Sequence, residues 1–219
     1  MILADFTSIA ERVMPYTMTD QERVAGLIFE VERVIDAGVP GDMAECGVWR
    51  GGSMMAVALT LLQRGIKDRD LWLYDTYEGM PPPEAVDVDL YGHAALDPSS
   101  GSYDAAGCTV GLATVQEAMR TTGYPEAKIH YVAGMVEDTL PSRAPERIAF
   151  LHLDTDWYKS TRHELEQLYP RVSPGGSVML DDYQHWQGCR KATDEYLAKV
   201  EPNIPLIRCG YTAVILRKS

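Results

Sequence analysis

The feature that most constrains the fold is an alternation of short apolar runs with segments of helical periodicity. Five of these runs have the length of strands, and they cover residues 43–48, 71–75, 128–134, 148–154 and 176–182. Helical patterns lie between them, most clearly at 52–64, 110–122 and 159–170. Strands that alternate with helices predict an α/β fold with a doubly wound, mostly parallel sheet covered on both faces. Two final runs around Gly210, PLIRCG and YTAVILRKS, predict an antiparallel hairpin at a sheet edge.

Residues 1–40 precede the first strand and predict an N-terminal helical cap. An amphipathic pattern over 2–14 ends at Pro15, and Thr19 with Glu22 forms a capping box at the start of a second helix. The apolar face of the first helix could be buried in a homodimer or against the chain's own sheet.

One long irregular segment, residues 78–108, interrupts the alternation after the second strand. It is rich in Pro, Gly, Asp and Ser, and a loop of this length is typical of a lid or an acceptor-binding loop, or of disorder. The length of 219 residues favours a single domain over residues 1–219 with one large core.

Composition narrows the class of partner. Asp and Glu total 32 against 20 Lys and Arg, and the formal net charge of -12 argues against nucleic acids and anionic membranes as partners. The 4 cysteines form no CxxC pair and have no clustered histidines, so neither a zinc site nor a disulfide scaffold is indicated. No signal peptide and no run of 18 apolar residues is found. We therefore predict a cytoplasmic protein that acts on a small molecule.

The first strand leads into a glycine-rich loop, ECGVWRGGS at 45–53, and then into a helix. Ligands of open α/β sheets bind at the carboxyl ends of strands, and the glycines permit tight turns and close approach of a ligand. The loop lacks the GxGxxG pattern, which argues against a nucleotide-dependent oxidoreductase. An acidic residue, Glu45, ahead of the glycines suits a ligand with an ammonium group, although an ordinary strand-to-helix turn is the alternative.

The second strand ends at Asp75, a position where an acid accepts hydrogen bonds from ribose hydroxyls. A nucleoside that carries an amino acid would use both Glu45 and Asp75, and S-adenosylmethionine fits that description. A role for Asp75 as a turn cap remains an alternative.

Carboxylates also follow the fourth and fifth strands, at Asp154, Asp156, Asp181 and Asp182. Neighbouring parallel strands would bring them together at one sheet edge, where they would repel one another unless a cation neutralised them. Oxygen ligands without His or Cys select Mg²⁺, Mn²⁺ or Ca²⁺ over zinc. The alternative is that Asp156 caps the helix that follows and Asp182 lies in a surface turn.

Five ordered motifs together resemble the macrocin O-methyltransferase family, whose members are metal-dependent enzymes that methylate sugar hydroxyls of antibiotics. These motifs are ECGVWRGGS, DTYEGMP (75–81), LDTDWYKST (153–161), LYPRVSPGGSVMLDDY (168–183) and CRKATDEY (189–196). The likeness runs from about Tyr16 to the C-terminus. It implies a class I methyltransferase fold, which is Rossmann-like, with S-adenosylmethionine as the methyl donor and Mg²⁺ as the cation. The catechol O-methyltransferases are similar at the same strand ends.

The resemblance implies a set of cofactor contacts. The set comprises Thr17, Met18, Glu45, Gly47, Ser53, Asp75, Thr76, Gly134, Val136, Glu137 and Asp154. Within it, Glu45, Gly47 and Ser53 would hold the methionine end and Asp75 the ribose. The adenine would lie against the residues from 134 to 137, and Thr17 with Met18 would close over the cofactor.

The resemblance also implies a metal set of Asp154, Asp181 and Asp182, with Asp154 as the candidate general base. Spacing does not decide between Asp154 and Asp156 within the DTD motif. His185 follows the metal pair, so we expect it to contact the acceptor or to assist proton transfer.

Two departures from the family pattern bear on the acceptor. The segment before Tyr16 is shorter than in the antibiotic-sugar enzymes, and Gln184 stands where Gly commonly follows the DDY motif. A catechol-type or other small vicinal diol is therefore the alternative to a glycoside. We expect Trp186 to pack in the wall of the site, with stacking on a sugar ring as the alternative. A non-catalytic partner subunit would be expected to show eroded motifs, and here they are intact.

Overall fold

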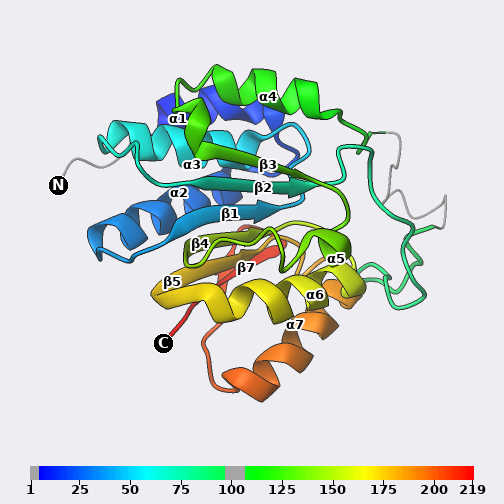
Figure 1. Cartoon of the computed structure of the whole chain (residues 1–219). Coiled ribbons are helices and arrows are strands. Elements are labelled where there is room, and N and C mark those ends of the chain that lie inside the picture. Colours follow the sequence, from blue (N-terminus) through cyan, green and yellow to red (C-terminus); the bar gives the residue numbers. More distant parts are fainter. Residues whose placement is uncertain (1–4, 97–106) are drawn as a thin grey trace.

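The structure is a computed structural model that describes residues 5–96 and 107–219 (Figure 1). Within these residues seven strands form one sheet in the order β3-β2-β1-β4-β5-β7-β6. The strands are β1 (Asp42–Cys46), β2 (Leu71–Asp75), β3 (Ile129–Ala133), β4 (Ile148–Leu153), β5 (Val172–Leu180), β6 (Ile207–Cys209) and β7 (Ala213–Arg217). The first five run parallel, and β7 pairs antiparallel with both β5 and β6. The predicted α/β class and the closing hairpin are both confirmed.

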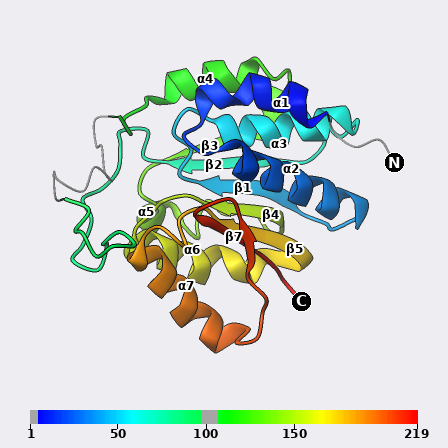
Figure 2. The ribbon, with the colours of Figure 1, turned by 180° about the vertical axis from the view of Figure 1, so that it is seen from behind.

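Helices cover both faces of the sheet (Figures 1 and 2). One layer contains α1 (Phe6–Val13), α2 (Gln21–Asp36), α3 (Gly52–Gln63) and α4 (Leu112–Arg120). The other contains α5 (Val136–Thr139), α6 (Tyr158–Leu168) and α7 (Gln187–Val200). Short 3-10 turns lie at Met14–Tyr16, Glu126–Lys128 and Tyr169–Arg171. None of the helices in the described residues combines the length and apolar character that a membrane crossing requires.

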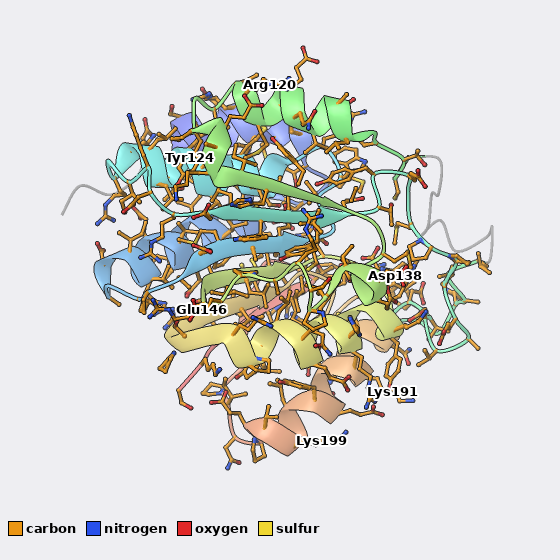
Figure 3. The ribbon with its side chains drawn as sticks, viewed as in Figure 1. Arg120, Tyr124, Asp138, Glu146, Lys191 and Lys199 are labelled. Atoms are coloured by element: carbon orange, nitrogen blue, oxygen red, sulfur yellow. The ribbon has the colours of Figure 1, made fainter. Side chains whose placement is uncertain are left out.

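The side chains of the central strands alternate between two buried cores, and side chains fill the space on both sides of the sheet (Figure 3). On β1, Met43 packs into the core beneath α1–α4, whereas Ala44 packs into the core beneath α5–α7. Phe150 and Leu151 divide in the same way on β4. A strand buried on both faces must be apolar at successive positions, which is why these segments are continuous apolar runs and not alternating ones.

The described elements correct some predicted boundaries. The second helix is capped by Asp20, whose carboxylate accepts a hydrogen bond from the Arg23 backbone N–H at 2.9 Å, so the Thr19 capping box is wrong. The fifth strand begins at Val172 and not at 176. The helix Gln187–Val200 was not among the predicted ones. In the predicted first helix, residues 1–4 lie outside the described part, and the remainder ends before Pro15 as expected.

The sheet order creates a switch point between β1 and β4. The chain builds outward from β1 through β2 to β3 and then returns to start β4 on the other side of β1. Connections diverge at this point and leave a crevice at the carboxyl ends of the two central strands. The described residues 78–96 of the long insertion lie on this side of the sheet (Figure 1), and residues 97–106 lie outside the described part.

Candidate active site

The glycine loop after β1 is shaped by a close backbone crossing. Gly47 has a φ of 84°, and a Cβ placed on it would stand 2.0 Å from the carbonyl oxygen of Asp154. Gly51 is the N-cap of α3 in the left-handed conformation. Only glycine meets both demands without strain, so the loop can bring the ends of β1 and β4 together.

A cavity of about 490 Å³ lies at the carboxyl ends of the strands and extends from this loop to the ends of β4 and β5. Ten of the eleven predicted cofactor residues line it, namely Thr17, Met18, Gly47, Ser53, Asp75, Thr76, Gly134, Val136, Glu137 and Asp154. The N-terminal segment lies directly on the glycine loop, because a Cβ on Gly52 would stand 2.6 Å from the Tyr16 carbonyl oxygen. The structure therefore gathers residues from far apart in the chain around one space.

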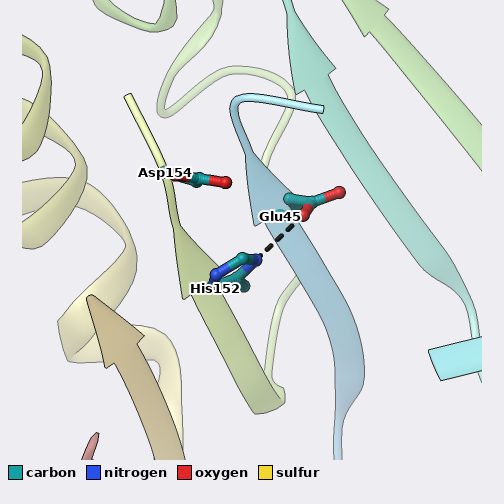
Figure 4. A group of neighbouring side chains, drawn as sticks. All are labelled: Glu45, His152 and Asp154. Atoms are coloured by element: carbon teal, nitrogen blue, oxygen red, sulfur yellow. Dashed lines mark hydrogen bonds and ion pairs between the residues drawn. The ribbon is translucent and has the colours of Figure 1, made fainter. Parts of the chain in front are cut away.

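Glu45 is the exception among the predicted cofactor residues. It does not line the cavity and is 1% exposed beneath it. Its Oε1 lies 2.9 Å from Nδ1 of His152 on β4 (Figure 4), and the Ser53 hydroxyl lies beside it. Burial raises the pKa of Glu45, while His152 and Ser53 counter that shift. Direct contact between Glu45 and the cofactor therefore stays a prediction, whereas Ser53, which lies beside Glu45, does line the cavity.

Asp75 ties two loops together at the cavity wall. One carboxylate oxygen accepts hydrogen bonds from the backbone N–H groups of Val48 and Trp49, at 2.7 and 3.1 Å. The other accepts from the N–H of Tyr77 at 2.7 Å. This arrangement supports the alternative of a turn cap, yet Asp75 also lines the cavity. Its contact with a ribose stays a prediction.

Three carboxylates converge where the cavity reaches the ends of β4 and β5. Ligand oxygens of Asp154, Asp156 and Asp182 lie within 4.8 Å of one another. Burial raises the pKa of Asp154 well above its ordinary value, and the neighbouring carboxylates Asp181 and Asp182 raise it further. Burial likewise raises the pKa of Asp156 to about 7. In the part of the chain that the structure describes, none of the three forms a salt bridge, and this all-oxygen donor set suits Mg²⁺ or Mn²⁺.

Asp181 lies beside this cluster and is already paired with a cation. Its Oδ2 accepts a hydrogen bond from the Arg23 guanidinium of α2, and its Oδ1 lies 3.5 Å from Nε2 of His152. Burial opposes the charge on Arg23, but Asp181, Asp154 and Asp182 outweigh it and raise the Arg23 pKa. The geometry thus groups Asp156, and not Asp181, with Asp154 and Asp182. Membership of Asp181 in the metal set stays a prediction.

The alternative roles predicted for Asp156 and Asp182, a helix cap and a residue of a surface turn, are both wrong. The N-cap of α6 is Trp157, and the Tyr158 N–H is bound at 2.8 Å by Asp87 of the long insertion and not by Asp156. Asp156 has a φ of 65°, which turns it out of the helical path. Asp182 is buried and does not lie in a surface turn.

His185 and Trp186 both line the cavity. The two rings meet edge to face at 4.7 Å between centroids, and Trp186 meets Trp157 in the same way at 5.0 Å. Burial lowers the pKa of His185, which favours a neutral ring able to accept a proton. Trp186 is buried in the wall of the cavity, which agrees with its predicted packing role. Participation of His185 in the reaction is not tested by the geometry and stays a prediction.

Several cavity residues were not predicted from the sequence. They include Tyr16, Arg23, Met80, Pro81, Cys108 and Thr212. Arg23 looks like an ordinary first-turn helix residue, and no local signal separates it from other surface arginines. His152 is a buried residue of β4, and its contacts with Glu45 and Asp181 depend on the strand order, which the local sequence does not reveal.

Comparison with known proteins places the chain among its relatives. The sequence profile described as Macrocin-O-methyltransferase (TylF) matches residues 9–218. The 8-demethyl-8-(2,3-dimethoxy-alpha-L-rhamnosyl)-tetracenomycin-C 4'-O-methyltransferase of Streptomyces olivaceus is 35% identical over 214 residues, which cover 97% of this chain and 77% of that protein. The demethyldecarbamoylnovobiocin O-methyltransferase of Streptomyces niveus is 34% identical, with 85% of this chain and 69% of that protein covered.

A solved structure of the O-methyltransferase NovP superposes with a TM-score of 0.82 at 32% identity, covering 93% of this chain and 82% of that one. The calicheamicin methyltransferase CalS11 superposes with a TM-score of 0.67 at 20% identity, covering 96% of this chain and 91% of that one, and therefore supports the fold alone.

Proposed function

Because the chain belongs to the macrocin O-methyltransferase family, we propose that it transfers the methyl group of S-adenosylmethionine to a hydroxyl of a sugar on a small natural product. The observation that carries this proposal is one cavity with two chemically different sides. A glycine loop and Asp75 lie at one end, and at the other lies a group of carboxylates that form no salt bridge within the described residues. The relative from Streptomyces olivaceus is named for a rhamnosyl substrate, which supports a glycoside acceptor.

The cofactor would lie along the glycine loop. Gly47 and Ser53 would face the methionine end, and Asp75 would accept hydrogen bonds from the ribose. Residues 134–137, which line the cavity beyond Asp75, would contact the adenine. The N-terminal segment at Thr17 and Met18 would cover the cofactor and exclude water from the sulfonium.

A divalent cation fits the acidic side because Asp154 and Asp182 present oxygens at close range and one buried oxygen of Asp182 has no hydrogen-bond partner in the described residues. We propose Asp154, Asp181 and Asp182 as its ligands, with Asp156 in place of Asp181 as the alternative. Mg²⁺, when bound, would polarise the acceptor hydroxyl and lower its pKa. Asp154 would accept the hydroxyl proton, and His185 lies near enough to the cavity to orient the acceptor.

The overall reaction is tested by methyl transfer itself. Purified protein with S-adenosylmethionine and Mg²⁺ should add one methyl group to a member of a panel of rhamnosides, detected by mass spectrometry, and EDTA should abolish the transfer. If the protein methylates catechols but no glycoside, the acceptor is a catechol-type diol and not a sugar. Failure to bind S-adenosylhomocysteine in calorimetry would overturn the reaction class.

A first prediction concerns the ribose. Asp75→Ala should weaken S-adenosylhomocysteine by about tenfold, because one charge-assisted hydrogen bond is lost. Asp75 also fixes the loop at Val48, so the binding of the 2′-deoxyribose analogue is measured alongside by calorimetry. The wild type should bind the 2′-deoxyribose analogue more weakly than S-adenosylhomocysteine. The Asp75→Ala variant should bind the two ligands equally well. If the missing hydroxyl weakens binding equally in both proteins, Asp75 only holds the loop in place and does not contact the ribose.

A second prediction separates the two metal sets. Asp181→Asn should weaken Mn²⁺ binding by at least about tenfold, and Asp156→Asn by less than about threefold. The ranking follows the ligand set that the family resemblance implies, in which Asp181 gives an oxygen to the cation. The geometry favours Asp156 instead, because Asp181 is already paired with the Arg23 guanidinium whereas Asp156 lies among carboxylates. Mn²⁺ affinity is read from electron paramagnetic resonance of the free ion. The reverse ranking would make Asp156 the third ligand.

A further inference from the structure

A buried polar chain runs beneath the floor of the cavity and joins its two sides. It comprises Ser53, Glu45, His152 and Asp181. The two end members line the cavity, whereas Glu45 and His152 are each 1% exposed and do not. Figure 4 shows His152 on β4 directed at Glu45 on the neighbouring β1, with Asp154 nearer the carboxyl end of the same strand.

The sheet fixes this geometry. Glu45 and His152 are cross-strand neighbours in the β1–β4 pairing, so their side chains stand side by side. The backbone N–H of Asp181 donates to the Leu153 carbonyl at 2.9 Å and holds the end of β5 against β4. His152 therefore lies between two carboxylates, at 2.9 Å from Glu45 through Nδ1 and at 3.5 Å from Asp181 through Nε2.

Within the described residues, no other group forms a hydrogen bond with the two atoms that face each other between His152 and Asp181. Neither His152 Nε2 nor Asp181 Oδ1 has a hydrogen-bond partner there, and the two atoms face each other at 3.5 Å, which is longer than an ordinary hydrogen bond. A buried carboxylate with one free oxygen costs free energy unless a donor faces it. The imidazole ring is the group that faces both acids at once.

We propose that His152 is a positioning residue that holds Glu45 in place behind Ser53 on the cofactor side and Asp181 in place on the cation side. The proposal rests on the proposed function, because Ser53 is assigned there to the methionine end and Asp181 to the cation. Partners of metal ligands fix the orientation of the ligand, and their loss typically costs metal affinity. One side chain would thus set the affinity of the pocket for two different ligands.

The two ring nitrogens allow the two contacts to be removed one at a time. The side-chain amide of asparagine stands near the position of Nδ1, so His152→Asn keeps a donor for Glu45 and loses the contact with Asp181. The amide of glutamine reaches the position of Nε2, so His152→Gln keeps a donor for Asp181 and loses the contact with Glu45. His152→Leu removes both.

The experiment measures two affinities for each variant, Mn²⁺ by electron paramagnetic resonance and S-adenosylhomocysteine by calorimetry. His152→Asn should weaken Mn²⁺ by about tenfold or more and leave S-adenosylhomocysteine within about threefold. His152→Gln should show the opposite pattern, and His152→Leu should weaken both. His130→Asn is the matched control, because His130 is also a strand histidine paired with a carboxylate, Asp70 at 2.6 Å, but lies outside the cavity.

The split between the two ligands distinguishes positioning from a general packing role. A histidine that only fills space would, when replaced, change both affinities together or neither, and either result in the Asn and Gln variants would overturn the proposal. If the Leu variant fails to fold, the two amide variants still give the test. A wild-type protein that binds neither ligand would overturn the proposed function, whereas one that binds both without the split overturns only the role of His152.

Discussion

Replacing Asp182 by asparagine should lower kcat by about 10³-fold or more while leaving the affinity for S-adenosylhomocysteine within about threefold. Asp182 belongs to both candidate metal sets, and one of its buried oxygens has no hydrogen-bond partner in the described residues. Its loss would remove a cation ligand beside Asp154, the proposed base. Loss of the cation and of an effective base acts on the transition state and not on cofactor binding.

Although Asp182→Asn should lower kcat, we do not expect it to lower the free energy of unfolding. Burial and the neighbouring Asp156 and Asp181 raise the pKa of Asp182, so the metal-free protein holds like charges together at a cost. Asp182→Asn should therefore leave the metal-free protein at least as stable to urea as the wild type. An inactive variant of unchanged or higher stability excludes misfolding as the cause.

Asp138→Asn provides the control, because Asp138 is an exposed acid on α5 outside the cavity wall (Figure 3). It should retain full turnover and Mn²⁺ affinity. Turnover of Asp182→Asn within tenfold of the wild type, and unaffected by EDTA, would contradict the metal assignment.

Gly47→Ala should lower the free energy of unfolding by about 3 kcal/mol or more. The φ of 84° at Gly47 strains any side chain, and its Cβ would stand 2.0 Å from the Asp154 carbonyl oxygen. Because that atom is backbone, β1 and β4 would have to separate at the cavity. Urea unfolding followed by circular dichroism measures the change.

Gly65→Ala separates the backbone strain of a positive φ from the steric clash with a neighbouring strand. Gly65 has a φ of 74°, but a Cβ on it would meet nothing within 4 Å. Its replacement should cost only the conformational strain of about 1 kcal/mol. Equal losses at Gly47 and Gly65 would mean that the close crossing of β1 and β4 does not limit the site.

Much of the fold follows from local patterns. The apolar runs of β1, β2 and β4 are buried on both faces, which makes them continuous in sequence and easy to place. The start of β5 was misplaced because Ser173, Pro174 and Gly175 are poor strand formers that the tertiary pairing overrides. The N-cap of α2 was misplaced by one residue because Thr19 and Asp20 are both acceptable caps.

The candidate site was predictable wherever a strand end alone determined the position. Asp75, Asp154 and Asp182 each follow an apolar strand, so the parallel sheet must deliver them to one edge. The sequence predicted the edge of the sheet at which Glu45 lies, but not its burial beneath the cavity or its pairing with His152. The direction of a side chain at a strand end depends on the pleat and on its cross-strand partner, here His152, which local sequence does not reveal.

The sequence by itself determined the α/β class, the family and the edge of the sheet at which the candidate site lies. Only the tertiary structure decided which charges face one another: Arg23 on Asp181, His152 between two acids, and Asp156 beside Asp182. The physical reason is that periodicity and strand ends are properties of neighbouring residues, whereas electrostatic partners are chosen by strand order and backbone crossings such as that at Gly47.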